Sequence, residues 1–418
     1  MTSTATVADV TLDGLVEQYR QVRGATERLC EPLAIEDYVV QSMTDASPTR
    51  WHLAHTTWFF ETLVLRPLVP DYRSVNDTFQ YLFNSYYNTL GDQFPRPQRG
   101  LLTRPTVEEV MRYRAHVDRH MIELFESSDL RSEIPVTVVL TGLNHEQQHQ
   151  ELMVTDLKHM LSHNPLHPVY RDAKQVPDVA ISALDWVEHA GGLVEIGFEG
   201  DGFAYDNEQP RHRVYLEPFR VAPRLVTCGE YLEFMQAGGY ARPEYWLSDG
   251  WAAVGEQGWC APLYWTQQDG QWMTYTLGGL REVNPAEPIC HVSYYEADAY
   301  ARWAGARLPT EAEWETVAKD CEISGNFVEA ERFHPVPSAA SSQMFGDVWE
   351  WTASSYSCYP GYQRPDGALG EYNAKFTSGQ MVLRGGSCAT PKSHIRPTYR
   401  NFFPPSARWQ FAGIRLAR

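Results

Sequence analysis

Two histidines, His145 and His149, lie four residues apart in the segment 145–151, whose sequence is His-Glu-Gln-Gln-His-Gln-Glu. Apolar residues flank this segment at helical spacing, so the pattern predicts a helix with both imidazoles one turn apart on one face. Two imidazoles at this spacing can bind a single metal ion. Gln148 shares that face because it follows His145 by three residues. A pair of helix-surface histidines without a metal is the alternative at this point.

The same letters match the HExxH motif of zinc peptidases, in which the glutamate is the general base. The metzincin form of that motif requires glycine at position 152 and histidine at position 155. Leu152 and Thr155 occupy those positions, and no glutamate-rich helix follows closely. Peptidase activity is therefore the weaker interpretation.

Three earlier segments also show helical periodicity, namely 12–30, 49–66 and 105–127. Together with the histidine helix they predict a four-helix bundle, in which metal sites form from inward side chains on facing helices. The second segment offers His52 and His55 as candidates for a third ligand. The apolar face on which His55 lies favours it, although a histidine there can also be a hydrogen-bonded core residue.

The connection at roughly 67–105 is long for a compact domain, and such connections commonly bind or catalyse. It contains the pair Tyr86 and Tyr87, followed by Arg96 and Arg99. A phenol can transfer a proton, and two arginines can hold a carboxylate. The alternative is a solvated loop whose tyrosines cover the core.

Composition limits the class of protein. A chain of 418 residues is long for one core, which predicts two domains. The net charge of −18 argues against nucleic acid or an anionic membrane surface as a partner. No apolar run is long enough to span a membrane, and the N-terminal sequence lacks a secretory signal. The seven scattered cysteines lack CxxC spacing, which indicates a reducing, cytoplasmic location.

The composition and the hydrophobic pattern of the sequence change along the chain, and this change predicts an α+β protein. Residues 1–165 form the expected bundle domain, and the polar, proline-containing segment 166–189 is the expected linker. In 190–418 glycines and short strand-like runs replace the long helical stripes, and eleven of the thirteen tryptophans lie after residue 180. We expect helices at 294–304 and after Thr310, whose side chain can cap the second helix.

Four motifs in the C-terminal half resemble formylglycine-generating-enzyme-like (sulfatase-modifying-factor) domains, whose fold is irregular, mixed and C-type-lectin-like. They are RLPTEAEWE at 307–315, GDVWEWT at 346–352, LRGGS at 383–387 and FAGIR at 411–415. A DinB-like four-helix domain ahead of such a domain resembles the ergothioneine sulfoxide synthases, the EgtB family. This resemblance covers nearly the whole chain.

The resemblance implies a non-haem Fe(II) ion held by His55, His145 and His149. It implies hercynine, a thiol donor and O2 as substrates, and a sulfoxide with a new C–S bond at C2 of the hercynine imidazole as product. Imidazole suits Fe(II). Because three histidines also suit zinc, the ligand types alone leave the metal open.

The resemblance assigns further roles in the bundle domain. Gln148 matches the position near the hercynine imidazole. Tyr86 and Tyr87 match a tyrosine pair of which one phenol donates a proton, and without that donor simple thiol oxidation is expected instead. Arg96 and Arg99 match the pair that receives the carboxylate of the thiol donor.

In the C-terminal domain, Asn401, Phe402 and Phe403 match the site for the trimethylammonium group, which aromatic faces bind. Core packing is the alternative for the phenylalanine pair. The branch of the family that uses γ-glutamylcysteine has Asp at the position of Phe403 and Arg at that of Ala407. Free cysteine is therefore the expected donor, while the neighbouring Arg408 keeps γ-glutamylcysteine open, as does a selenium donor.

Two other functions remain as alternatives. A formylglycine-generating activity needs two adjacent redox cysteines, and Cys358 and Cys388 lie thirty positions apart in the sequence. The other alternative is a non-catalytic, metal-binding DinB protein with a lectin-like partner domain.

Overall fold

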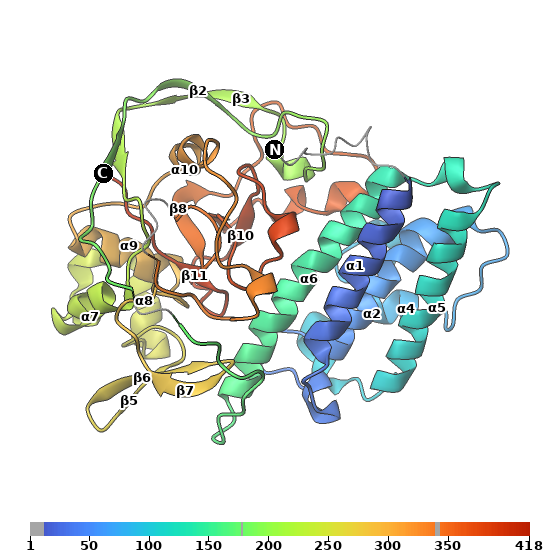
Figure 1. Cartoon of the computed structure of the whole chain (residues 1–418), viewed down its shortest axis with the longest axis horizontal. Coiled ribbons are helices and arrows are strands. Elements are labelled where there is room, and N and C mark those ends of the chain that lie inside the picture. The colour runs from blue at the N-terminus through green and yellow to red at the C-terminus, as the bar shows by residue number, and fades with distance from the viewer. Residues whose placement is uncertain (1–11, 177–178, 339–342) are drawn as a thin grey trace. The chain divides into compact units, whose positions relative to one another are not determined.

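The computed structural model describes residues 12–176, 179–338 and 343–418 (Figure 1). The first eleven residues, to which the expectation of no secretory signal refers, lie outside this description. The chain folds into two compact units, which we call the bundle unit and the mixed unit. The bundle unit comprises Met1–His163, Gly200–Asp206 and Arg364–Asn373, and the mixed unit comprises Asn164–Glu199, Asn207–Gln363 and Ala374–Arg418.

The helices expected from periodicity are present in the bundle unit and form the blue to green ribbons of Figure 1. They are α1 (Leu12–Cys30), α2 (Thr49–Phe60), α5 (Val107–Glu126) and α6 (Val136–Ser162). The short helix α4 (Phe79–Phe83) lies in the connection at 67–105, where no helix was expected. The start of α5 is fixed by Thr106, which exchanges hydrogen bonds with Glu109 in a capping box. Helix α2 packs against both α5 and α6, and all twelve of its residues are buried.

The predicted helix 49–66 contains an irregularity. After α2 the chain passes through a π-helical turn, Glu61–Leu65, before the short helix α3 (Arg66–Leu68). The Glu61 carboxylate accepts hydrogen bonds from the hydroxyls of Tyr72 (2.7 Å) and Tyr113 (2.5 Å). This buried carboxylate is therefore satisfied at the turn where the helix changes its winding.

The long connection is ordered by side chains that bond to its backbone. The Asn84 amide donates to the carbonyl oxygens of Tyr87 and Gly91, both at 3.1 Å. The Glu371 carboxylate, from the Arg364–Asn373 segment, accepts from the backbone N–H of Thr89 (2.8 Å) and from its hydroxyl (2.7 Å). A segment distant in sequence thus completes the bundle unit.

The mixed unit contains short strands, which over the described residues form four small sheets and together with the bundle confirm the α+β class. The largest sheet has the order β10 (Asn401–Phe403), β9 (Met381–Arg384), β8 (Trp349–Ser355) and β11 (Ala412–Gly413). Its pairs are antiparallel except β8 with β11, which is parallel. The other sheets are β1 (Val187–His189) with β4 (Phe219–Val221), β2 (Gly192–Ile196) with β3 (His212–Leu216), and β5 (Trp265–Gln268), β6 (Gln271–Thr276) and β7 (Gly279–Glu282).

Helices accompany these sheets, namely α7 (Cys228–Gln236), α8 (Ser248–Gln257), α9 (Tyr294–Trp303) and α10 (Glu311–Ala318). The helix predicted at 294–304 and the cap at Thr310 are both confirmed, because the Thr310 side chain accepts from the Glu313 backbone N–H. None of the helices in the described ranges is both long enough and apolar enough to cross a membrane.

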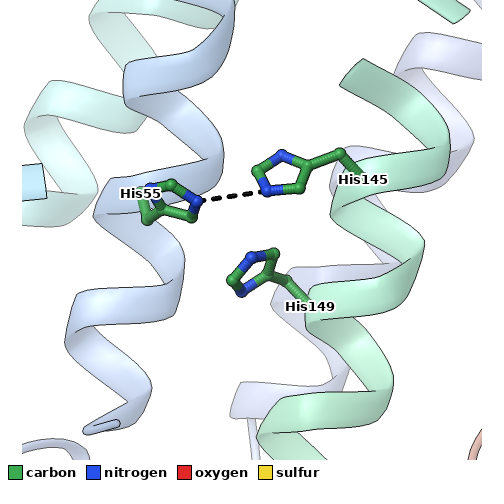
Figure 2. Close-up of side chains that lie close together, drawn as sticks. All are labelled: His55, His145 and His149. Carbon is green, nitrogen blue, oxygen red and sulfur yellow. Dashed lines mark hydrogen bonds between the residues drawn. The ribbon is translucent and has the colours of Figure 1, made fainter. Parts of the chain in front are cut away.

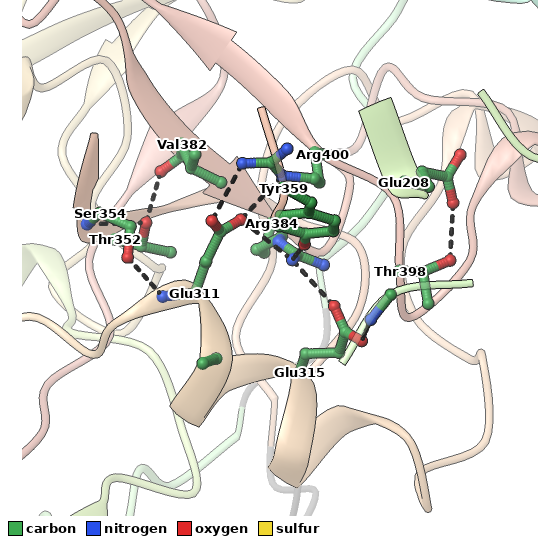
Figure 3. Close-up of polar contacts among 12 residues, drawn as sticks. Glu208, Glu311, Glu315, Thr352, Ser354, Tyr359, Val382, Arg384, Thr398 and Arg400 are labelled. Atoms are coloured by element: carbon green, nitrogen blue, oxygen red, sulfur yellow. Dashed lines mark hydrogen bonds and ion pairs between the residues drawn. The ribbon is translucent and has the colours of Figure 1, made fainter. Parts of the chain in front are cut away.

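The RLPTEAEWE motif builds a buried ion-pair network in the mixed unit (Figure 3). Glu311 accepts hydrogen bonds from the guanidinium groups of Arg400 (2.9 and 3.0 Å) and Arg384 (3.2 Å). Arg384 also donates to Glu315 at 2.9 Å. Glu311 and Glu315 of this motif are therefore compensated inside the core by arginines from other segments, which indicates a structural role.

Candidate metal centre

His55 on α2 and His145 and His149 on α6 point toward one another (Figure 2). All three are buried, and one ring nitrogen of each lies within 4.8 Å of those of the other two. The Nε2 atoms of His55 and His145 are 3.1 Å apart. The helical spacing of His145 and His149 and the packing of α2 against α6 produce this cluster.

The orientation of His55 is fixed by its surroundings. Its Nδ1 lies 2.6 Å from the carbonyl oxygen of Phe83, so Nδ1 carries the hydrogen and Nε2 keeps a lone pair toward the cluster. The ring stacks on Trp51, with centroids 4.6 Å apart, and on Trp58 at 5.7 Å. The residue that the sequence favoured as third ligand is thus held in the form that a metal ligand needs.

Burial keeps the cluster uncharged. It lowers the pKa of His145 to about 3, and it lowers the pKa of His55 and of His149 well below the ordinary value. The neighbouring imidazoles lower the pKa of His55 and His149 further. Neutral imidazole is the metal-binding form, so three buried nitrogen donors fit a divalent transition metal such as Fe(II) or zinc.

The other candidate, His52, is engaged elsewhere. Its Nδ1 lies 2.8 Å from Nδ1 of His149, and its Nε2 lies 3.1 Å from the Asp156 carboxylate. Both nitrogens therefore have partners, and the structure brings His55 rather than His52 into the cluster.

Glu146, the glutamate of the HExxH match, lies on a different face of α6. Its carboxylate is fully buried and accepts from Arg23 (2.8 Å), Arg114 (2.7 Å) and Thr26 (2.7 Å). Burial alone would raise the pKa of Glu146, but Arg114 and Arg23 lower it to about 2. It cannot serve as the general base of a zinc peptidase, because it is locked in a salt-bridge network.

Tyr86 and Tyr87 lie at the edge of the cluster. Their rings stack at 4.6 Å, and the Tyr87 ring is 5.6 Å from that of Trp58, which stacks on His55. Burial raises the pKa of both phenols well above the ordinary value. Both hydroxyls therefore keep their protons at neutral pH, as a proton donor must.

A further tyrosine, Tyr372, reaches the cluster from a distant segment, and a second one stacks on it. The Tyr372 hydroxyl donates to Oε1 of Gln148 at 2.5 Å, and its ring lies 5.8 Å from that of His145. Tyr205 stacks on Tyr372 with centroids 5.2 Å apart. Neither residue stands in a motif, so no pattern in the sequence pointed to them. Only the folding of segments 200–206 and 364–373 onto the bundle reveals their position.

The two predicted arginines lie in different surroundings, because Arg99 is buried and Arg96 is exposed. Arg99 is only 3% exposed, its guanidinium lies 3.3 Å from the centre of the Trp51 ring, and it donates to the hydroxyls of Ser47 (2.9 Å) and Ser85 (3.1 Å). Its Nε has no hydrogen-bond partner among the residues that the structure describes. Burial, together with Arg96, lowers the pKa of Arg99 to about 8. Arg96 itself is exposed and donates to the Asp45 carbonyl oxygen.

Asn401, Phe402 and Phe403 form strand β10 of the mixed unit. Phe402 stacks on Tyr356, with centroids 4.0 Å apart and planes 14° from parallel, and lies 6.0 Å from Phe376. Asn401 accepts the backbone N–H of Phe402 through its side chain (2.9 Å), and Phe403 makes an edge contact with Trp409 at 6.0 Å. An aromatic group thus surrounds Phe402.

Comparison with known proteins finds a different domain family in each half of the chain. The DinB superfamily matches residues 18–153, and the sulfatase-modifying factor enzyme 1-like domain matches residues 172–342 and 340–418. The hercynine oxygenase of Mycolicibacterium thermoresistibile is 30% identical over 444 aligned residues, which cover 96% of this chain and 94% of that protein. The chain belongs to the hercynine oxygenase family. This confirms the family expected from the sequence motifs, and with it an oxidoreductase.

Two other hercynine oxygenases have a similar sequence identity to this chain. That of Mycolicibacterium smegmatis is 32% identical over 408 residues, covering 89% of this chain and 91% of that protein. That of Mycobacterium tuberculosis is 33% identical over 301 residues, covering 66% and 70%. The formylglycine-generating alternative requires a pair of adjacent redox cysteines, and the two candidate cysteines differ in their surroundings. Cys358 is exposed and Cys388 is buried, and the structure pairs neither of them in a disulfide among the described residues.

Proposed function

We propose that this family member is an Fe(II)- and O2-dependent enzyme that joins cysteine to C2 of the hercynine imidazole and yields a sulfoxide. The observation that carries the proposal is the buried, neutral cluster of His55, His145 and His149 in a chain related over most of its length to hercynine oxygenases. These three residues would hold the iron, which when bound supplies the redox chemistry with O2 and favours the thiolate form of the donor.

Arg99 is the residue that we assign to the carboxylate of the thiol donor. Its guanidinium is buried, is bonded to serine hydroxyls rather than to a carboxylate, and keeps Nε without a partner among the described residues. A buried guanidinium without a carboxylate partner is stabilised strongly when a carboxylate binds to it. Arg96 is exposed, so we give it at most a part in the outer approach of the donor.

The phenols of Tyr86 and Tyr87 supply the proton that directs the reaction toward the sulfoxide. Their raised pKa values keep them protonated until a strong base forms nearby. Gln148 contacts the imidazole of hercynine. The hydrogen bond that the Tyr372 hydroxyl donates to Gln148 fixes the orientation of the Gln148 side-chain amide.

Asn401 and the aromatic group of Phe402 and Phe403 hold the trimethylammonium group of hercynine. A quaternary ammonium has no N–H to donate, so aromatic faces are its natural binding partners. The parallel stack of Phe402 on Tyr356 offers such a face.

Cysteine is the donor that we favour over γ-glutamylcysteine. Ala407 is buried and apolar, and Phe403 carries no charge, so neither can pair with a γ-glutamyl group. Arg408 is already committed, because its guanidinium donates to Glu296 at 2.7 Å and lies 4.4 Å from the centre of the Trp259 ring.

The test is anaerobic loading with Fe(II), followed by O2 uptake and mass analysis of products from hercynine with cysteine, γ-glutamylcysteine or a selenium donor. We expect stoichiometric iron, O2 consumption and a sulfoxide with cysteine. A protein that binds iron but consumes no O2 would be the non-catalytic metal-binding alternative. Retention of zinc with peptide cleavage would instead mark a peptidase.

A further inference from the structure

A fourth buried histidine lies beside the cluster without belonging to it. His52 is one turn before His55 on α2, and Asp156 is two turns after His149 on α6. The three side chains form a continuous path, with 2.8 Å between the Nδ1 atoms of His149 and His52 and 3.1 Å between His52 Nε2 and Asp156 Oδ2. His52 and Asp156 are 3% and 6% exposed, so water does not replace these contacts.

The directions of these hydrogen bonds follow from the chemistry of the groups. A carboxylate only accepts, so Nε2 of neutral His52 carries the hydrogen and Nδ1 of His52 keeps a lone pair. That lone pair can only accept, so Nδ1 of His149 is the donor. Nε2 of His149 then keeps its own lone pair, which is the form that a metal ligand needs.

The path ends on a fixed backbone. The same Oδ2 of Asp156 accepts the backbone N–H of Ser47 at 2.8 Å, and the Ser47 hydroxyl accepts from Arg99 at 2.9 Å. Asp156 is therefore held in place by the segment that precedes α2. Through Ser47 the path also reaches the buried arginine, so one chain of contacts connects His149 with Arg99.

We propose that His52 and Asp156 are positioning residues that fix His149 with its hydrogen on Nδ1 and its Nε2 lone pair toward the metal. The proposal rests on the metal site of the proposed function and deepens it. Partners of this kind hold a ligating histidine in one tautomer and one orientation, and their loss costs about 10- to 100-fold in metal affinity or activity. His52 thereby serves the metal without touching it.

The test measures metal affinity directly, by titrating the metal-free protein with Co(II) and following its visible absorption. His52→Phe removes both ring nitrogens, and we expect Co(II) affinity to fall by about 10- to 100-fold with a changed spectrum. His52→Asn keeps an acceptor near the position of Nδ1, and its affinity should stay within about threefold of wild type on the same scale. Asp156→Asn keeps the acceptor oxygen without the charge and should fall between these two.

His120→Phe is the matched control, because His120 is a partly buried histidine on α5 outside the cluster, bonded to the His116 carbonyl oxygen. It should leave Co(II) affinity and spectrum unchanged, and thermal melting of each metal-free variant shows that it folds. Wild-type affinity in His52→Phe would overturn the proposal. So would an Asn variant as weak as the Phe variant, because His52 would then act by packing or as a ligand. A wild-type protein that binds no Co(II) would instead overturn the metal site itself, and the proposal with it.

Discussion

Arg99 in the bundle unit and Arg384 in the mixed unit are both buried arginines, yet their surroundings are opposite. Arg384 donates to Glu311 and Glu315. Burial alone would lower the pKa of Arg384, but Tyr359 and these two carboxylates raise it above the ordinary value. Arg99 is bonded to two serine hydroxyls, and its pKa is lowered to about 8.

The contrast extends to the other buried polar groups. Arg415 is compensated by Glu350 in the mixed unit, and Glu146 is compensated by Arg23 and Arg114 on one face of α6. On another face of the same helix, His145 and His149 belong to a cluster that, over the described part of the chain, consists of histidines alone. Compensated charges stabilise or specify the fold, whereas uncompensated groups indicate places where a ligand completes the structure.

The most severe test of this contrast removes a cluster histidine. In His145→Ala two imidazoles remain, and iron content should fall from stoichiometric to background, with loss of O2 uptake. His120→Ala, on α5 and outside the cluster, should retain full iron. Metal analysis after gel filtration checks both variants. A His145→Ala protein that keeps its iron would show that the cluster is not the metal site.

Breaking a compensated group should act on stability instead. Arg384→Met leaves Glu315 buried without its cation, and we expect a loss of about 3–5 kcal/mol in the free energy of unfolding. That corresponds to a fall of roughly 6–20 °C in the melting temperature of a unit of this size. The control is Arg211→Met, because Arg211 forms a solvent-exposed pair with Glu199 at 2.9 Å. Its effect should stay below about 1 kcal/mol. Equal melting temperatures for the two variants would remove the contrast.

Acid should weaken the metal-free bundle through the histidine cluster. The pKa values of His55, His145 and His149 are lowered in the folded state, so below pH 6.5 the unfolded chain binds more protons than the folded one. The contribution of the three neutral histidines to the free energy of unfolding is therefore fully present above pH 6.5 and is lost as the pH falls. The loss at pH 5.5 is about 1 kcal/mol for each histidine.

Denaturant unfolding of the metal-free protein at pH 7.5 and 5.5 measures this loss. A variant with all three histidines replaced by asparagine should lose much less over the same interval. Bound metal should also reduce the loss, because it competes with protons for the same nitrogens. An identical pH dependence in the variant and the wild type would show that the cluster is not held neutral.

The phenols beside the cluster should control which product forms. Tyr87→Phe or Tyr86→Phe should lower sulfoxide formation by about 100-fold, the typical contribution of a positioned proton donor, while cysteine oxidation persists or rises. Product ratios by mass spectrometry identify the tyrosine that acts. If both variants keep the wild-type ratio and Tyr372→Phe alone changes it, the donor is the tyrosine from segment 364–373.

Removing Arg99 should have the smallest effect on the fold and a specific effect on the substrate. We expect Arg99→Met to change the free energy of unfolding by no more than about 1 kcal/mol, because no carboxylate among the described residues loses its partner. The KM for cysteine should rise by about 10- to 100-fold with the loss of a charged hydrogen bond. Arg96→Met, at an exposed position, is the control and should change KM little. A stability loss as large as that of Arg384→Met would contradict the comparison.

The sequence by itself determined what depends on local periodicity. The four long helical segments, the facing of His145 and His149, and the cap at Thr310 follow from side chains three or four residues apart. The motifs of the C-terminal half identified the family of that domain. These motifs contain buried charged residues of its core.

The tertiary structure decided which side chains meet. His52 and His55 lie on the same helix, and only the packing of α2 against α6 placed His55 in the cluster and His52 against Asp156. It also buried Arg99 and left Arg96 in solvent. Tyr372 reaches His145 from a segment far away in sequence, and Tyr205 stacks on Tyr372 from another. No local pattern in the sequence predicts contacts over such separations.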